Sequence, residues 1–150
     1  MGDNPVGPHA DAGGYQFSEQ IGHLLRRAYQ RHLAIFQANA SDPQVTSMQF
    51  VTLCALRDNG PSSQTDLIRI TGIDQATIRG IIQRLKGRAL VGDGTDEGDR
   101  RKVVVHLTKA GERLLDEMIP CARRITELTF GDLNPAERVA LDFILRAMIK

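Results

Sequence analysis

Cysteine is scarce in this sequence, and long apolar runs are missing. Only two cysteines occur, Cys54 and Cys121, which is too few for a disulfide framework and fits a reducing compartment. No apolar stretch approaches the roughly 20 residues that cross a bilayer. The acidic N-terminal segment MGDNPVGPHADAGG has no apolar core of the kind found in signal peptides. These absences predict a cytoplasmic protein with no membrane-spanning segment.

Motifs of catalysis and metal binding are also missing. The sequence contains no P-loop, no dinucleotide fingerprint and no nucleophile motif. Cys-x-x-Cys is absent, and the four histidines show no spacing typical of zinc ligands. We therefore predict no catalytic residue, no metal site and no cofactor, and we expect that the protein is not an enzyme.

The net charge is nearly balanced. There are 19 basic and 18 acidic residues, so any surface that attracts nucleic acid must be local. A length of 150 residues suits one domain with a sizeable core. Residues 1–14 offer little to bury, and we expect them to form a disordered arm.

Apolar spacing and capping residues predict a mostly helical chain. A first helix is expected over about residues 17–38. Thr46 and Gln49 stand in capping-box relation at the start of a second helix, which should end near Gly60.

Two more helices follow and are joined by a tight turn at Gly72, as in a helix-turn-helix. Ser63 is placed to cap the first of them and Asp74 the second, which is expected over about residues 74–88. Helical periodicity assigns the second of these helices a buried stripe of four apolar residues: Ile78, Ile81, Ile82 and Leu85.

A hairpin and two long helices complete the predicted order. Residues 89–95 and 102–107 have the composition of two strands, and a hairpin directly after a helix-turn-helix is a wing. Thr108 is placed to cap a long helix that Pro120 should bend. Asn134 is placed to cap a final helix whose apolar residues are expected to be buried: Val139, Leu141, Phe143, Ile144 and Ala147.

The helix predicted over residues 74–88 has an unusual outward face. Opposite the buried stripe, small residues lie between long hydrogen-bond donors: Ala76, Thr77, Arg79, Gly80, Gln83, Arg84 and Gly87. Glycine inside an exposed helix costs about 1 kcal/mol relative to alanine. Such a low ridge would let a major groove approach the backbone, where Arg reads guanine and Gln reads adenine. A solvated face with incidental glycines is the alternative interpretation.

The loop between the predicted strands is strongly charged. It carries Asp96, Glu97 and Asp99 beside Arg100 and Arg101. We expect Asp99 to pair with an arginine and to hold it extended at the hairpin tip, where it would enter a narrow minor groove. An ordinary surface ion pair is the alternative.

Three segments resemble the MarR family (multiple antibiotic resistance type) of transcription regulators, and the resemblance covers residues 17–150. They are TSMQFVTLCAL ahead of the helix-turn-helix, SQTDLIRITGIDQATIRGIIQRLKGRALV across it, and DEGDRRKVVVHLTKAG over the wing and the next helix start. The resemblance implies a mainly α (α+β) fold. Its winged helix-turn-helix lobe would span residues 46–107 with the wing at 90–107, and dimerisation helices would occupy residues 15–45 and 108–150.

This resemblance also implies a function and the residues that perform it. A homodimeric repressor would bind double-stranded DNA at a near-palindromic operator. Positions that match the family's DNA-binding elements are Ser63, Gln64, Asp74, Gln75, Ala76, Thr77, Arg79, Gly80, Gln83, Arg84, Asp99, Arg100 and Arg101. Two features depart from the family pattern: Ala89 replaces a usual glycine, and Gly92–Gly94 replaces strand residues that often include an arginine.

A small-molecule effector is implied as well, since aromatic or phenolic acids often release members of this family from DNA. The candidate effector-binding residues are His23, Arg27, Ser47, Met48, Val51 and Thr52. A histidine and an arginine could hold a carboxylate between apolar walls. Alternatively, His23 and Arg27 are solvated or pair across the dimer.

Two other functions stay open on the sequence. The modest net charge would suit a winged-helix module that binds protein rather than DNA. Cys54 or Cys121 would suit a redox-responsive regulator, although Cys54 lies on an apolar stripe typical of a small core residue.

Overall fold

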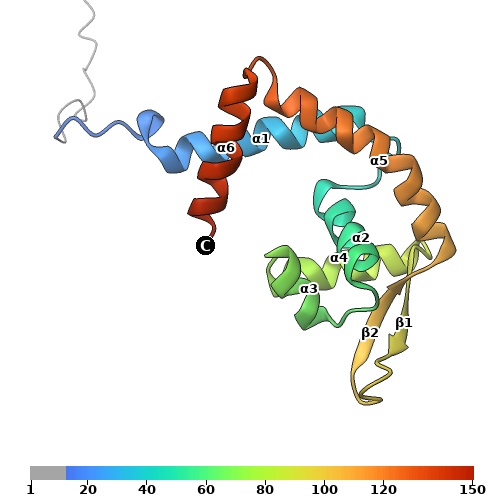
Figure 1. Ribbon diagram of the computed structural model, residues 1–150. Coiled ribbons are helices and arrows are strands. Elements are labelled where there is room, and N and C mark those ends of the chain that lie inside the picture. Colours follow the sequence, from blue (N-terminus) through green and yellow to red (C-terminus); the bar gives the residue numbers. More distant parts are fainter. Residues whose placement is uncertain (1–12) are drawn as a thin grey trace, which may run out of the picture.

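The computed structural model describes residues 13–150, which are built mainly of helices with one small sheet (Figure 1). In chain order the elements are η1 (Phe17–Glu19), α1 (Ile21–Asn39), α2 (Ser47–Asn59), α3 (Gln64–Thr71), α4 (Gln75–Gly87), β1 (Val91–Thr95), β2 (Val103–Leu107), α5 (Lys109–Phe130) and α6 (Pro135–Met148). The predicted order of helices and strands is confirmed. The arm predicted at residues 1–14 lies outside the described residues except for its last two positions.

Polar side chains begin the helices at the predicted positions. The hydroxyl of Thr46 accepts a hydrogen bond from the N–H of Gln49, whose side chain accepts one in return from the N–H of Thr46. This capping box starts α2. Ser63 and Asn134 begin α3 and α6 in the same way, and Thr108 caps α5.

The first predicted helix is divided in the structure. The sequence predicts one helix over about residues 17–38, whereas η1 ends at Glu19 and α1 begins at Ile21. Gln20 between them has extended backbone angles, φ −78° and ψ 143°, which interrupt helical hydrogen bonding. Its side chain donates to the carbonyl oxygen of Gln16 at 2.9 Å.

The core lies where the helices of the lobe meet. The predicted stripe of α4 is buried, with each side chain at most 6% exposed: Ile78, Ile81, Ile82 and Leu85. It belongs to one cluster with Leu53 of α2, Leu67 of α3 and Met118 of α5. Burial of an apolar side chain of this size contributes about 1.5–3 kcal/mol. This cluster therefore holds α4 with its opposite face outward.

The wing is an antiparallel hairpin that extends beyond the helices of the lobe (Figure 1). Val91 lies opposite Leu107, and Thr95 lies opposite Val103. A single bridge joins Ser62 to Val105, and the N–H of each donates to the carbonyl oxygen of the other at 3.0 and 2.8 Å. This bridge attaches the wing to the chain just ahead of α3.

α1 lies beside α5, away from the wing (Figure 1). Arg31 donates to the carbonyl oxygens of Leu128 at 2.9 Å and Thr129 at 2.7 Å, which lie in the last turn of α5. His32 Nδ1 lies 2.9 Å from the Thr129 hydroxyl, and burial lowers the pKa of His32. Pro120 lies inside α5, which changes direction near its middle as predicted (Figure 1).

The apolar stripe of α6 is exposed, contrary to the prediction. No residue of α6 is buried in the single chain, and Val139 and Phe143 are 72% and 73% exposed. Arg138 of α6 reaches α5, where it pairs with Glu127 at 2.6 Å, but the apolar stripe of the helix stays exposed. Further large apolar side chains are exposed from η1 into α1: Phe17, Ile21, Leu24, Leu25 and Tyr29. The terminal helices thus present apolar surface that the described part of their own chain does not cover.

Candidate nucleic-acid interface

The outward face of α4 combines exposed hydrogen-bond donors with an open backbone. Arg79, Gln83 and Arg84 are exposed, as is Ala76, and they lie opposite the buried stripe. A Cβ atom built on Gly80 would meet no heavy atom within 4 Å. The ridge between the long side chains is therefore low and unobstructed.

Asp74 orders the first turn of α4. Its carboxylate accepts hydrogen bonds from the N–H of Thr77 at 2.9 Å and from the Thr77 hydroxyl at 2.7 Å. These bonds lower the pKa of Asp74. Because the hydroxyl of Thr77 donates its proton to Asp74, it cannot act as a donor to another group. A surface hollow of about 510 Å³ lies beside this turn and is lined by Asp74, Gln75, Ala76 and Arg79.

Ion pairs divide the basic residues of the lobe into two groups. Three of the seven basic residues in positions 74–102 pair with carboxylates: Lys86 with Asp93 at 2.7 Å, Arg88 with Asp42 at 2.5 Å and Lys102 with Asp66 at 3.1 Å. The other four have no carboxylate of residues 13–150 within 4.0 Å: Arg79, Arg84, Arg100 and Arg101. All four are exposed, so these cations are available to an external anion.

The wing tip differs from the prediction at Asp99. Its carboxylate accepts a hydrogen bond from the N–H of Arg101 at 3.0 Å, and no ion pair joins it to an arginine within residues 13–150. The prediction of an Asp99–arginine pair is therefore wrong. The side chain shapes the turn instead, as a short acidic residue commonly does two positions ahead of an N–H group. Arg100 and Arg101 are left exposed at the tip.

At the start of α3 the two predicted contact residues differ in exposure. Ser63 is only 9% exposed, and its hydroxyl accepts a hydrogen bond from the N–H of Asp66 at 3.1 Å. The structure thus uses Ser63 as a helix cap. Gln64 is partly exposed at the first helical position.

A separate cavity of about 380 Å³ lies between α1, α2 and the turn of the helix-turn-helix. It is lined by Tyr29, Ser47, Met48, Val51, Thr71, Gly72, Ile73 and Asp74. Three predicted effector residues, Ser47, Met48 and Val51, are thus brought together. Tyr29 and the turn from Thr71 to Asp74 also line the cavity, which the sequence did not predict because no motif marks them and only packing brings them beside α2.

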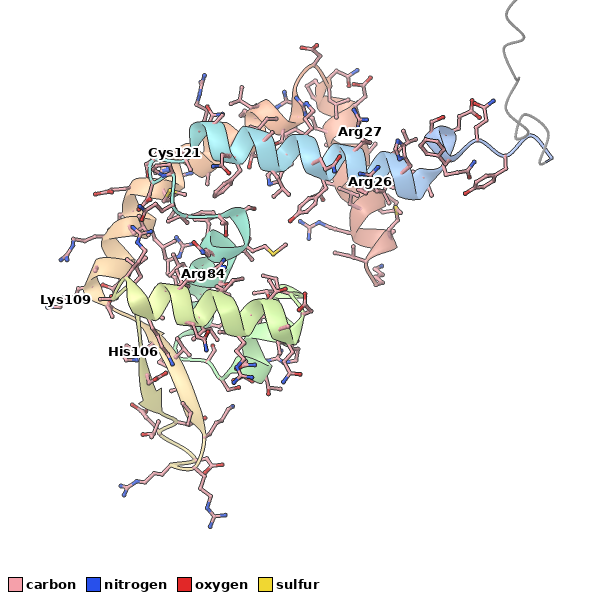
Figure 2. The ribbon with its side chains drawn as sticks, turned by 180° about the vertical axis from the view of Figure 1, so that it is seen from behind. Arg26, Arg27, Arg84, His106, Lys109 and Cys121 are labelled. Carbon is pink, nitrogen blue, oxygen red and sulfur yellow. The ribbon has the colours of Figure 1, made fainter. Side chains whose placement is uncertain are left out.

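The other three predicted effector residues lie outside this cavity. Thr52 is fully buried, and its hydroxyl donates to the carbonyl oxygen of Met48 at 2.8 Å. His23 Nδ1 lies 3.1 Å from the guanidinium of Arg26, and the ring of His23 meets the ring of Phe17 edge-on. Arg27 is exposed on α1, in the layer opposite the wing (Figure 2).

Both cysteines are half-buried and form no disulfide. Burial raises the pKa of the Cys54 thiol, which disfavours the reactive thiolate. In the part of the chain that the structure describes, no three His, Cys, Asp or Glu side chains converge as a metal site. No helix within residues 13–150 is long and apolar enough to span a membrane.

A hairpin wing directly after a helix-turn-helix defines a protein of the winged helix-turn-helix class, and exposed arginines on both elements are the electrostatic feature expected of a nucleic-acid interface. The family model described as MarR family matches residues 44–102. Together with the relatives described next, this match shows that the chain belongs to the MarR family.

Relatives match over nearly the whole chain. The transcriptional repressor NicR of Pseudomonas putida is 66% identical over 135 residues, which are 90% of this chain and 85% of NicR. The structure of Bordetella bronchiseptica BpsR, whose DNA binding is regulated by 6-hydroxynicotinic acid, has a TM-score of 0.86 and 58% identity over 92% of this chain and 99% of BpsR. Streptomyces coelicolor PcaV in complex with its natural ligand has a TM-score of 0.82 and 25% identity over 90% and 95% of the two chains.

Proposed function

We propose that this regulator is a homodimeric repressor that binds a near-palindromic operator and is released by a small aromatic acid. The observation that carries the proposal is the division of charge on the lobe. Lys86, Arg88 and Lys102 are paired with carboxylates, whereas four exposed arginines have no such partner within residues 13–150: Arg79, Arg84, Arg100 and Arg101. Available cations on a recognition helix and a wing are what phosphates and base edges require.

α4 would enter the major groove with its outward face. Arg79 is suited to guanine and Gln83 to adenine, and the low ridge at Ala76 and Gly80 lets the groove edge come close. Arg100 and Arg101 at the wing tip would lie at the neighbouring minor groove. In this proposal residues 46–107 form the DNA-binding lobe, and repression of chromosomal genes would take place in the cytoplasm.

A second copy of the chain would cover the terminal helices. The exposed apolar residues of α1 and α6 support this, because monomeric proteins rarely leave extended apolar patches in water. Residues 15–45 and 108–150 would then form the dimerisation layer. The symmetry of such a dimer would place two α4 helices about one helical turn of DNA apart.

The cavity at Tyr29, Met48 and Val51 is the proposed effector site. Its volume of about 380 Å³ suits a small ligand, and apolar walls with few polar groups are typical of such sites. Ser47 and Met48 lie in the first turn of α2, where free N–H groups favour a carboxylate. Regulation of the relative BpsR by 6-hydroxynicotinic acid makes that compound the first candidate.

Occupation of this cavity would act on the DNA-binding face through the turn that lines it. Asp74 belongs both to the cavity wall and to the cap of α4. A ligand that prefers one arrangement of this turn shifts the population toward it, provided that its affinities for the two states differ. His23 and Arg27 remain predicted ligand contacts, to be tested by substitution.

Operator discrimination tests the proposal. Fluorescence anisotropy would compare a duplex that carries an inverted repeat from the region upstream of the gene with a scrambled duplex of equal length. Arg79→Ala and Gln83→Ala should each reduce the preference for the operator. Arg101→Ala should weaken binding to both duplexes and reduce the salt slope by about one unit for each phosphate that the variant no longer neutralises.

Arg88→Ala is the matched control, since Arg88 lies at the end of α4 but is paired with Asp42. Its discrimination ratio should equal that of the wild type. Unchanged discrimination in both Arg79→Ala and Gln83→Ala would remove α4 as the reading element.

A further inference from the structure

Lys102 lies directly after the two wing arginines but does not point free into solvent. Its Nζ atom is 3.1 Å from Asp66 Oδ2 on α3 and 3.8 Å from Asp96 Oδ2 on the wing. Only 38% of the Lys102 side chain and 29% of the Asp66 side chain are exposed. In the sequence Arg100, Arg101 and Lys102 form one basic run, whereas the structure separates the lysine from it.

The main chain of Lys102 closes the wing loop at the same place. Its N–H donates to the carbonyl oxygen of Asp99 at 3.0 Å, and its carbonyl oxygen accepts from the N–H of Asp96 at 3.1 Å. The loop that carries Arg100 and Arg101 is therefore closed by hydrogen bonds at Lys102. Movement of Lys102 would move both arginines.

Asp66 has further partners on α3 and its cap, among them Arg69, whose Nη2 lies 3.7 Å from Asp66 Oδ1. Its carboxylate accepts a hydrogen bond from the N–H of Ser63 at 3.0 Å, which completes the capping box of α3. Hydrogen bonds from Ser63 and Lys102 lower the pKa of Asp66 to about 2. The carboxylate thus joins the first turn of the helix-turn-helix to the end of the wing loop.

We propose that Lys102 and Asp66 are positioning residues for DNA binding, which set the wing arginines relative to α4 without contacting DNA themselves. The inference rests on the proposed binding of duplex DNA. The ion pair is partly exposed and by itself contributes little to stability, so Lys102→Met, which leaves the Ser63–Asp66 cap intact, should change DNA binding rather than the unfolding temperature.

The direction in which Asp66→Asn changes DNA affinity distinguishes a positioning role from an effect of charge alone. Removal of a carboxylate raises the positive charge of each protomer, which by charge alone should tighten binding to DNA. Loss of positioning should instead weaken it. The asparagine keeps an oxygen that can accept from Ser63, so the helix cap is retained in part.

The experiment measures operator affinity by anisotropy for Asp66→Asn, Lys102→Met and Lys102→Arg, alone and in an Arg100→Ala/Arg101→Ala background. We expect Asp66→Asn and Lys102→Met to weaken binding about five- to tenfold, and Lys102→Arg to stay near the wild type. In the arginine-free background, Lys102→Met should have almost no further effect, because the groups it positions are gone. Lys109→Met, which removes an exposed lysine from α5, controls for the removal of one charge.

Two outcomes would overturn the inference. If Asp66→Asn bound the operator as tightly as the wild type or more tightly, a positioning role would be excluded. It would also be excluded if Lys102→Met kept its full effect in the Arg100→Ala/Arg101→Ala background, because that result would indicate direct contact of Lys102 with DNA. Circular dichroism would establish that each variant is folded, and Lys102→Met leaves the α3 cap untouched if Asp66→Asn fails to fold. A wild-type protein that binds no duplex would contradict the proposed function instead.

Discussion

A Cβ atom at position 111 would collide with the carbonyl oxygen of Leu90, so the first turn of α5 presses directly on the chain between α4 and β1. Gly111 is buried there, and its N–H donates to the Thr108 hydroxyl at 3.1 Å. The Thr108 hydroxyl in turn donates to the carbonyl oxygen of Ala89 at 2.6 Å. These contacts join the proposed dimerisation layer to the base of the wing.

Gly111→Ala should therefore destabilise the protein by about 2–4 kcal/mol, because a backbone carbonyl cannot move aside as a side chain would. Urea denaturation followed by circular dichroism would measure the change. A difference below about 0.5 kcal/mol, the usual effect of a neutral surface substitution, would contradict the close approach.

Gly80→Ala should have the opposite effect on stability. The added methyl group meets no atom within 4 Å, and alanine is favoured over glycine in a helix by about 1 kcal/mol. The same methyl group would obstruct the ridge that we propose faces the major groove, so operator affinity should fall although stability rises. Equal affinity of the two proteins in a gel shift would show that DNA does not approach the backbone at Gly80.

Phe143→Glu should convert the protein to a monomer. The side chain is 73% exposed on α6 in the single chain, and a buried charge at a dimer interface is strongly unfavourable. Light scattering after size exclusion would report the mass. Val103→Glu, at another apolar position that is 64% exposed on the wing, should leave the mass unchanged. A monomeric wild type would refute the proposed dimer.

Val51→Phe should block the proposed effector site while preserving DNA binding. The larger ring would fill part of the cavity of about 380 Å³. The wild type should gain several degrees in unfolding temperature with 6-hydroxynicotinic acid in excess, since a ligand that binds only the native state stabilises it. The variant should not, whereas Arg26→Gln, outside the cavity on α1, should respond as the wild type does. An undiminished shift in Val51→Phe would place the ligand elsewhere.

Acid unfolding should depend on Asp66. Its pKa is about 2 in the folded protein and near 3.9 in an unfolded chain. A lowered pKa contributes stability above about pH 4, and this contribution disappears as the pH falls from about 4 to 2. Denaturation curves across that window should converge for the wild type and Asp66→Asn. Asp142→Asn, which removes the exposed ion pair with Arg146 on α6, should change stability less.

The backbone angle of Ala89 explains a departure from the family pattern that the sequence alone could only note. The sequence marks it as a departure from a usual glycine. In the structure Ala89 has a φ of 56°, a left-handed conformation that costs an L-residue roughly 1–2 kcal/mol. The turn from α4 into β1 requires this angle. This explains why glycine is usual at this position in the family.

The sequence by itself determined the order of the elements, the caps and the buried stripe of α4, because these depend on neighbours three or four residues apart. It also predicted the outward face of α4, since that face is whatever the stripe leaves exposed. Local periodicity and capping predict these features, although they did not predict the break at Gln20 that divides the first helix.

Only the tertiary structure decided which charges are paired. No sequence pattern separates the paired residues Lys86, Arg88 and Lys102 from Arg79 and Arg84, which are unpaired within residues 13–150. The carboxylate partners lie in other segments of the chain, and Asp42 is 46 residues from Arg88. Tyr29 lines the cavity for the same reason, since it lies on α1 and only packing brings it beside α2 and the turn of the helix-turn-helix. Electrostatic pairing and cavity walls depend on distances through space, which packing sets and sequence spacing does not.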